Sequence, residues 1–278
     1  MKSPVLSILF LLISVTLLAV PNDFRFRHFS VEDGLSSNSV RAIMQDKYGF
    51  LWIGTEEGLN RYDGIMIKSY SICPQAAGKY ISSLYGTKKN IWIGTDEGIY
   101  IYAYATETFT YFDLTTPNNV RITSIVNHIL QDKDGNLWFS TNGQGLFRYN
   151  LSKNYLEQYE FTSAFGIVAS TMADSDNQIW ALTNQGESGV YKLNKAENKF
   201  EPFGLLYNAG NHHSQALAML EDSEQTLWLG TWECGLQKID KYTRQTTTYL
   251  HPTDGKGVTH IHSLMEYAPH QLLSLIHI

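Results

Sequence analysis

The stretch GFLWIGTEEGLNRYDG, residues 49–64, decides the fold because its pattern returns along the chain. A tryptophan in a short apolar run is followed by a threonine, a glycine turn and a second short run. Four later stretches repeat this order at intervals of 40, 46, 42 and 48 residues, and the five anchor tryptophans are Trp52, Trp92, Trp138, Trp180 and Trp228. A degenerate sixth copy places Leu273 in the tryptophan column. A unit repeated at this period indicates a repeat architecture.

Each unit has room for four short strands. An apolar stretch such as Val40–Met44 leads through a polar turn to the tryptophan strand, and two further short runs follow, the last rich in Thr, Tyr and Phe. Four strands in a period of about 40–45 residues are typical of a β-propeller blade. We therefore predict an all-β β-propeller with five recognisable four-stranded blades plus a partial sixth, which is an incomplete ring of a seven-bladed propeller.

Packing in such a ring restricts two columns of residues. We expect the anchor tryptophans to pack between neighbouring blades, with a neighbouring strand or turn accepting the indole N–H. Inner strands converge on the axis, so bulky side chains should be excluded there. Counting four residues back from each turn aspartate or its equivalent gives Ala42, Ser82, His128, Ser170, Ala218 and Ser263. His128 is the large exception, and we predict that it lines the central channel.

Composition excludes several classes of protein. The chain has 278 residues, 43% of them hydrophobic, which suits a folded core, and a net charge of −6 predicts no contact with nucleic acid. The two cysteines, Cys73 and Cys234, lie in units far apart, so we expect no disulfide. Neither the cysteines nor the scattered histidines have metal-ligand spacing, and the turn from Asp132 to Asn136 lacks the Gly and Glu of a calcium loop. We predict no metal and no cofactor.

The two ends of the chain differ from the repeats. Lys2 precedes an apolar run, Pro4–Val20, that would span about 25 Å as a helix. Residues 1–20 are therefore interpreted as a signal peptide or, alternatively, an N-terminal anchor. Residues 23–273 are assigned to the partial propeller, with Asp23–Ser30 as an outer strand that closes the last blade. Residues 274–278 do not continue the repeat, and we interpret them as a tail foreign to it.

One face of the ring is predicted to carry the functional loops. Because chain direction alternates within a blade, the turn between strands two and three shares a side with the connection to the next blade. Long irregular segments gather there, and functional residues favour such loops. The candidate ligand-binding residues in these turns, together with His128 in the channel, are Glu56, Glu57, Asp96, Glu97, Asn142, Gln144, Asn184, Glu187, Trp232 and Glu233.

Trp232 lies outside the tryptophan column, so packing does not explain it as it explains the anchors. An aromatic face among carboxylates and amides suits a sugar ring. The alternative is a solvated polar rim with one half-covered tryptophan. No nucleophile, phosphate-binding loop or positioned pair of carboxylates indicates a catalytic residue.

The opening unit resembles a known family. Residues 24–64, FRFRHFSVEDGLSSNSVRAIMQDKYGFLWIGTEEGLNRYDG, are similar to the start of the periplasmic sensor region of hybrid two-component system sensor histidine kinases from Bacteroidetes. The recurring pattern D-x-x-G-x-[LI]-W-[IL]-G-T-x-x-G-[LI] is similar to the two-component-regulator propeller repeat. The fourth unit departs from it with WALTNQGESG.

The resemblance implies a larger parent protein. Such proteins carry two seven-bladed propellers, an immunoglobulin-like domain, a transmembrane helix and a cytoplasmic histidine kinase, and they sense products of glycan breakdown. It implies a periplasmic sensor fragment that recognises an oligosaccharide or another small periplasmic ligand. It also implies a parent in the inner membrane that forms a homodimer, with membrane contact through the parent's helix or an uncleaved N-terminal segment. The alternatives are an exported propeller enzyme, a polysaccharide lyase or glycosidase, and a protein-interaction scaffold.

Overall fold

The structure, a computed structural model, describes residues 27–72, 79–161, 166–183, 189–205, 215–232, 235–249 and 260–277. Within these ranges the chain forms antiparallel sheets and one short 3-10 helix, η1 (Val31–Asp33). No helix of the described ranges has the length and apolar character needed to cross a membrane. The predicted signal or anchor segment, residues 1–20, lies outside these ranges, as do Cys73 and Cys234.

The sheets follow one another in sequence, and each is a simple up-and-down meander. The strands are β1 (Val40–Gln45), β2 (Leu51–Thr55), β3 (Gly58–Tyr62) and β4 (Ile67–Tyr70); β5 (Ile81–Gly86), β6 (Asn90–Thr95), β7 (Gly98–Ala103) and β8 (Thr108–Tyr111); β9 (Val126–Gln131), β10 (Leu137–Thr141), β11 (Leu146–Asn150) and β12 (Tyr155–Tyr159); β13 (Val168–Ala173), β14 (Ile179–Thr183), β15 (Gly189–Asn194) and β16 (Lys199–Leu205); β17 (Ala216–Glu221), β18 (Leu227–Thr231), β19 (Leu236–Ile239) and β20 (Thr246–Thr248); and β21 (His260–Ala268) with β22 (Gln271–His277).

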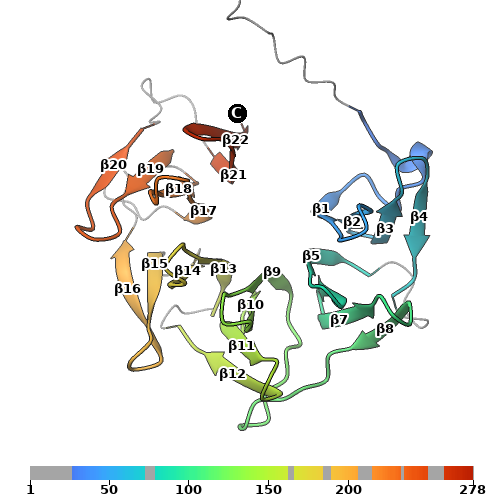
Figure 1. Cartoon of the computed structure of the whole chain (residues 1–278), viewed down its shortest axis with the longest axis horizontal. Helices are drawn as coiled ribbons and strands as arrows, with labels where there is room; N and C mark the ends of the chain where they lie inside the picture. Colours follow the sequence, from blue (N-terminus) through green and yellow to red (C-terminus); the bar gives the residue numbers. More distant parts are fainter. Residues whose placement is uncertain are drawn as a thin grey trace, which may run out of the picture.

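Figure 1 shows the six sheets placed side by side around a common axis, with β1, β5, β9, β13, β17 and β21 nearest the centre. Five sheets have four strands and the sixth has two. The ring is open between the β1–β4 sheet and the β21–β22 sheet (Figure 1). The predicted all-β propeller of five blades and a partial sixth is confirmed, and the seventh blade stays a prediction.

A turn aspartate holds each anchor tryptophan except one. In the third blade, Asp132 follows β9, and its Oδ1 accepts the backbone N–H of Asn136 at 2.8 Å. Its Oδ2 accepts the indole N–H of Trp138 at 2.8 Å. The same bond joins Trp52 to Asp46 at 2.8 Å, Trp180 to Asp174 at 3.0 Å and Trp228 to Asp222 at 2.6 Å. One carboxylate therefore closes the turn and fixes the orientation of the indole ring. We call this pair of hydrogen bonds to the turn aspartate the clamp.

The clamped rings pack into the next blade. Trp52 contacts Ile91, Ile93 and Tyr102 of the second sheet, and the ring centroids of Trp52 and Tyr102 are 5.1 Å apart. The first four anchors, Trp52, Trp92, Trp138 and Trp180, are at most 3% exposed. Trp228 is only partly buried, because the sheet that follows it has two strands. Packing between blades is confirmed as the role of the anchors.

A cation lies over the same indole in the blades that have the aspartate. These side chains come from the third strand of each blade, where the residue pairs across from the tryptophan. The distances from cation to ring centroid are 5.7 Å for Arg61 over Trp52, 5.6 Å for Arg148 over Trp138, 5.3 Å for Lys192 over Trp180 and 5.9 Å for Lys238 over Trp228. The cation adds a further attraction to the face of each ring.

The second blade lacks both partners. Its first turn is one residue shorter, since Gly86 pairs with Ile91 where Gln45 of the first blade pairs with Leu51. Thr87 stands in place of the aspartate and Ile101 in place of the cation. Among the described residues, nothing accepts the buried indole N–H of Trp92.

The shorter turn also corrects the predicted inner column. Ser83, and not Ser82, pairs with Gly94 as Ala42 pairs with Gly54 in the first blade. Counting back from the turn gave the wrong serine because the count assumed turns of equal length. The remaining members of the column keep their predicted register.

The ends of the described chain differ from two expectations. Residues 27–30 are not in a strand, while residues 23–26 lie outside the described ranges, so the predicted outer strand over 23–30 is wrong for its second half. Phe29 instead packs on Tyr62 with ring centroids 4.8 Å apart. At the other end, Leu273 pairs with Met265 as the anchors pair with their inner strands, but β22 continues to His277. The predicted propeller boundary at Leu273 therefore falls inside a strand.

Asp132→Ala should lower the free energy of unfolding by about 2–3 kcal/mol, because it leaves buried N–H donors without an acceptor. Chemical denaturation followed by tryptophan fluorescence measures this change. Asp134→Ala is the matched control: Asp134 is exposed in the same turn and should cost less than about 1 kcal/mol. Equal losses in the two variants would contradict the clamp.

Thr87→Asp should stabilise the chain by about 1 kcal/mol, since the added carboxylate oxygen can accept the orphaned N–H of Trp92. The melting temperature should rise by roughly 2–4 °C. Thr106→Asp adds the same charge to an exposed turn of the same blade and should leave the melting temperature unchanged. A Thr87→Asp variant that melts lower than the parent would show that the short turn cannot present the carboxylate.

Candidate functional site

Backbone bonds define one end of the ring. The turn between strands two and three is tied to the residue that precedes the inner strand of the same blade: Glu56 N donates to Ser39 O at 3.1 Å, and Trp232 N donates to Gln215 O at 2.9 Å. Asn142 N makes the equivalent bond to the residue before β9. These turns therefore share a side with the connections between blades, as predicted. We call this side, with Glu56, Asn142 and Trp232, the connection face.

A central cavity of about 530 Å³ opens along the axis. All six inner strands contribute to its lining, which includes every predicted column residue, Ala42, Ser82, His128, Ser170, Ala218 and Ser263, together with Ser83. The prediction that His128 lines the channel is confirmed. Arg41, Asn127 and His262 bring further polar groups into the lining.

These three polar residues enter the cavity through β-bulges. The ladder between the first two strands skips Arg41 in the first blade, Asn127 in the third and His262 in the sixth. A bulge bends the strand and re-aims the extra side chain. Asn127 then donates from Nδ2 to Val168 O of the next blade at 2.9 Å. The bulges thus line the channel with polar groups, and the one at Asn127 also joins two neighbouring blades.

His128 accepts a backbone hydrogen bond within the lining of the channel. Thr171 N lies 3.5 Å from its Nδ1 in donor geometry, so the neutral ring carries its proton on Nε2. Burial lowers the pKa of His128 below its usual value. The hydroxyls of Ser83 and Ser170 lie in the same lining. This arrangement can donate and accept hydrogen bonds with a polar ligand or with water.

Two of the predicted carboxylates are paired with cations. Arg41 Nε donates to Glu56 Oε1 at 3.0 Å, and this hydrogen bond holds the pKa of Glu56 below its usual value. Glu97 forms an ion pair with Lys79, whose side chain is 8% exposed. Glu57 and Asp96, the other acidic candidates in these turns, are exposed. The rim therefore presents ion pairs next to free carboxylates.

Gln144 is used by the fold. Its Oε1 accepts Thr123 N at 2.9 Å and Ser124 N at 3.0 Å, and its Nε2 donates to Arg121 O at 2.9 Å. These bonds hold the connection that enters β9, so the amide has little capacity left for a ligand. Asn142, predicted beside it, is exposed.

Trp232 is the centre of an aromatic cluster on the connection face. Its side chain is 40% exposed, and its ring lies 3.8 Å from the ring of His260, centroid to centroid. His262 meets it edge-on at 5.9 Å. Both histidines lie on β21, and no sequence signal connects them with Trp232, which is 28 residues before His260. Glu233, Asn184 and Glu187 lie outside the described residues.

No group of three or more His, Cys, Asp or Glu side chains that could hold a metal ion is found in the described part of the chain. His212 and His213 lie outside it. The chemistry of the connection face is that of ion pairs, hydroxyls, histidines and one exposed indole.

Comparison with known families gives a match to the two component regulator propeller over residues 34–57 and 120–143. Both segments contain the hairpin in which the turn aspartate meets the tryptophan, at Asp46–Trp52 and at Asp132–Trp138. Two segments of the chain thus match the two-component regulator propeller repeat. The resemblance stated from the sequence is confirmed, and the clamp is the physical feature that the two segments share.

A curated relative, histidine kinase P4 from Formosa agariphila, is 46% identical over 68 residues. That match covers 24% of this chain and 5% of the relative, so the chain spans a small part of the relative's length.

Two solved structures are similar in fold. One is the extracellular domain of a putative hybrid two-component system from Bacteroides thetaiotaomicron, with a TM-score of 0.71, 21% identity, and coverage of 92% of this chain and 34% of that one. The other is a catalytically inactive virginiamycin B lyase from Staphylococcus aureus, with a TM-score of 0.62, 16% identity, and coverage of 80% and 73%. At these identities both show the fold alone.

His128 predicts a pH dependence of stability. Its pKa is lower in the folded chain than in the unfolded chain, so the unfolded state binds more protons as the pH falls. The contribution of His128 to stability is therefore fully present above its pKa in the unfolded chain, about 6.5, and is lost as the pH falls below that value. Melting temperatures measured between about pH 7.5 and about pH 5.5 should fall less in His128→Gln than in the parent chain.

Carboxylates do not confuse this measurement, because their unfolded pKa values of about 4 lie below the range. His28→Gln is the matched control, since His28 is exposed. If His28→Gln and His128→Gln changed the pH profile alike, burial of His128 would not be the cause.

Proposed function

We propose that this chain is the ligand-sensing propeller of an extracytoplasmic two-component sensor, and that it recognises an oligosaccharide at the connection face. The observation that carries the proposal is the exposure of Trp232. The anchors that follow the repeat are buried or partly buried in blade packing, whereas Trp232 presents its ring beside two histidines. A sugar ring can stack on such a face while its hydroxyls bond to the surrounding polar groups.

The surroundings of Trp232 support this choice of ligand. The cavity that opens beside it is lined by hydroxyls, an amide, Arg41, His128 and His262. These groups both donate and accept hydrogen bonds, which matches the hydroxyls of a sugar better than an apolar ligand. The similarity to extracellular domains of two-component systems supports a sensing role for the fold.

Signalling would then be a property of the whole parent protein. The proposal includes a periplasmic location, a homodimeric parent in the inner membrane and a cytoplasmic histidine kinase. A ligand biases such a protein only through different affinities for its two states. The interfaces between blades are where a bound ligand could favour one arrangement, because the cavity is lined by strands of all six sheets.

An exported polysaccharide lyase or glycosidase is the second candidate, since a lyase shares the fold. Glycoside hydrolysis commonly needs a pair of carboxylates. Among the described residues that line the central cavity, the titratable groups are Arg41, His128 and His262, and none is a carboxylate. The site as described therefore favours binding over turnover.

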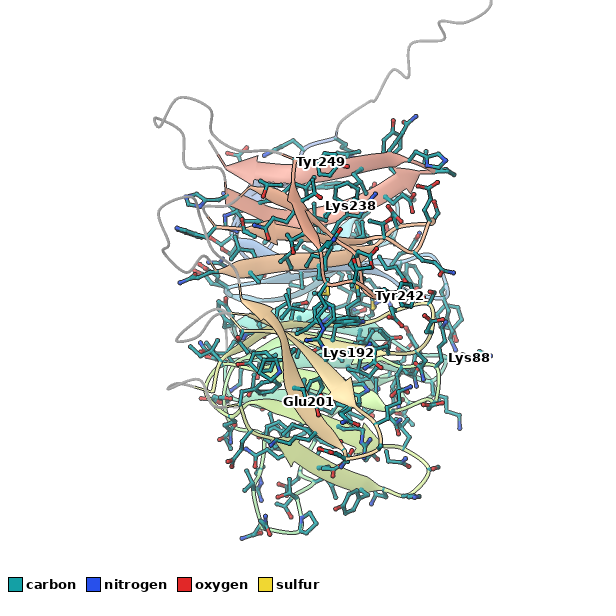
Figure 2. The ribbon with its side chains drawn as sticks, turned by 90° about the vertical axis from the view of Figure 1, so that its left-hand side faces the viewer. Lys88, Lys192, Glu201, Lys238, Tyr242 and Tyr249 are labelled. Atoms are coloured by element: carbon teal, nitrogen blue, oxygen red, sulfur yellow. The ribbon has the colours of Figure 1, made fainter. Side chains whose placement is uncertain are left out.

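Trp232→Ala should weaken binding of the recognised oligosaccharide by about tenfold or more, which corresponds to about 1.4 kcal/mol. Isothermal titration of the chain against a panel of neutral and acidic oligosaccharides measures the affinity. Tyr242→Ala is the matched control, because Tyr242 is 77% exposed on the outer side of the ring (Figure 2). Its affinity should equal that of the parent.

Three results would count against the proposal. If no member of the panel binds, the proposed ligand class is wrong. If Trp232→Ala binds with unchanged affinity, the proposed binding site at Trp232 is wrong. Cleavage of an oligosaccharide, detected by chromatography after incubation, would establish the enzyme in place of the sensor.

A further inference from the structure

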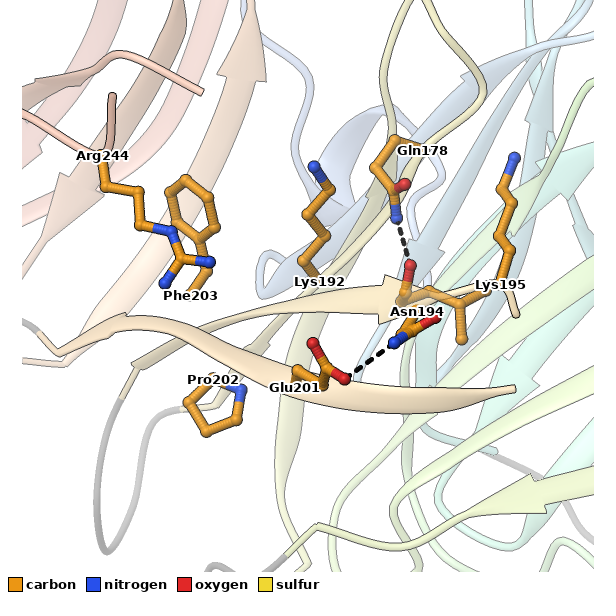
Figure 3. Close-up of a pocket in the computed structure, with 9 residues that line it drawn as sticks. Gln178, Lys192, Asn194, Lys195, Glu201, Pro202, Phe203 and Arg244 are labelled. Atoms are coloured by element: carbon orange, nitrogen blue, oxygen red, sulfur yellow. Dashed lines mark hydrogen bonds between the residues drawn. The ribbon is translucent and has the colours of Figure 1, made fainter. Parts of the chain in front are cut away.

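A groove between the fourth and fifth sheets, away from the axis, gathers positive charge. The cavity is about 340 Å³ in volume, and Lys192, Lys195 and Arg244 line it together with Glu201 and Phe203. Figure 3 shows these side chains around the groove, with Arg244 contributed by the fifth blade and the others by β15 and β16 or the turn between them. We call this the cationic groove. Figure 2 shows that Lys192 and Glu201 lie on the outer side of the ring.

A β-bulge builds the wall of the groove. Val190 pairs with Gly204 and Tyr191 pairs with Pro202, so Phe203 is the extra residue on β16. The bulge turns its ring onto Trp180, which it meets edge-on with centroids 4.8 Å apart. The guanidinium of Arg244 lies 5.1 Å from the centroid of Phe203. Stacking holds this cation in place and leaves the N–H edge of the guanidinium available.

The cations of the groove lack acidic partners. In the part of the chain that the structure describes, no carboxylate lies within salt-bridge distance of Lys192, Lys195 or Arg244. The third blade shows the contrast, because Arg148 forms an ion pair with Glu157, its neighbour across the strands.

Glu201 is the corresponding neighbour of Lys192, but its Oε1 instead accepts a hydrogen bond from Asn194 Nδ2 at 2.8 Å. The lining of the groove thus has three cations and one carboxylate, in a chain whose net charge is −6. Local placement, and not overall composition, makes this groove positive. An anionic group would supply the missing partner.

The shape of the groove separates small anions from acidic peptides. A peptide commonly binds a free sheet edge by adding a strand. β16 is the outer strand of its sheet, but Pro202 lacks an N–H and the bulge interrupts its edge. Strand addition is therefore disfavoured at this place. A compact ligand that presents one or two negative groups fits the volume of about 340 Å³ and the cations that line it.

We propose that the cationic groove binds the carboxylate or sulfate group of an acidic saccharide, at a site separate from the connection face. Arg244 would meet the anionic group with its planar N–H edge. Lys192 and Lys195 would add two flexible positive charges. The choice of a saccharide over other small anions rests on the proposed oligosaccharide sensing. The choice of an anion rests on the groove alone.

The test titrates the chain with digalacturonate, a sulfated chondroitin disaccharide and neutral cellobiose, at low and high NaCl concentration. One acidic disaccharide should bind, more weakly at high salt, and the double variant Lys192→Gln/Arg244→Gln should weaken it by tenfold or more. Lys238→Gln is the matched control: Lys238 lies over Trp228 as Lys192 lies over Trp180, but outside the groove. It should bind as the parent does. Thermal melting checks that each variant is folded. Lys192→Arg keeps a flexible positive charge and should retain binding.

Several outcomes would overturn the proposal: equal affinity in parent and double variant, tighter binding of hexaglutamate than of either acidic disaccharide, or inorganic sulfate binding as tightly as the disaccharides. The Trp232→Ala variant separates this site from the connection face. If Trp232→Ala binds the acidic disaccharide normally and the groove variant does not, the groove stands whether or not the connection face binds a sugar. If Trp232→Ala loses binding of the acidic disaccharide and the groove variant keeps it, the groove is not the binding site.

Discussion

The hydrogen bond from the anchor indole to the turn aspartate is the interaction that organises four of the five four-stranded blades in the described part of the chain. The buried carboxylate of Asp132 accepts hydrogen bonds from the indole N–H of Trp138 and from the turn backbone. The same group therefore defines the hairpin and the orientation of the indole ring. The oriented ring then packs on the next sheet. A charged acceptor is strong in a dry setting and costly to leave without donors. The second blade shows what packing achieves without this bond: Trp92 lacks the aspartate and the cation together, and its ring is still buried, with its N–H left unpaired among the described residues.

A scaffold held in this way leaves one end of the ring free to vary. The clamps lie at the turns between strands one and two, whereas the bulges at Arg41, Asn127 and His262 lie near the opposite ends of the inner strands. The backbone there departs from a regular ladder, and the extra side chains reach the cavity or the rim. Trp232 is the clearest result: an indole that no packing column requires, supported by His260 on the next inner strand.

The sequence predicted the features that repeat and missed those that occur once. Periodic tryptophans predicted the sheets, their order and the buried anchors, because blade packing imposes the same demand in each unit. Ser82 was assigned to the inner column wrongly because the first turn of the second blade is one residue shorter. The spacing between the anchor tryptophans does not reveal this difference. Gln144 was predicted as a ligand residue, but the residue type does not show that backbone donors occupy its amide. The cationic groove depends on the bulge at Phe203, which no local sequence signal marks.

Both candidate sites lie where one sheet meets the next, and this position has a physical consequence. Within a sheet the backbone ladder is continuous, whereas the polar bonds between sheets are made by individual side chains. Lys241 of the fifth blade makes one of them: its buried amine reaches Asp176 of the fourth blade at 2.9 Å and also binds Glu221 of its own sheet at 2.8 Å. A serine makes another kind of link twice, from Ser175 to Glu221 of the fifth sheet at 3.0 Å and from Ser223 to Glu266 of the sixth at 2.7 Å. A ligand seated inside one sheet would meet a rigid surface and have little to change. A ligand that bridges two sheets contacts groups whose spacing depends on how the sheets pack, so its binding energy can favour one packing over another.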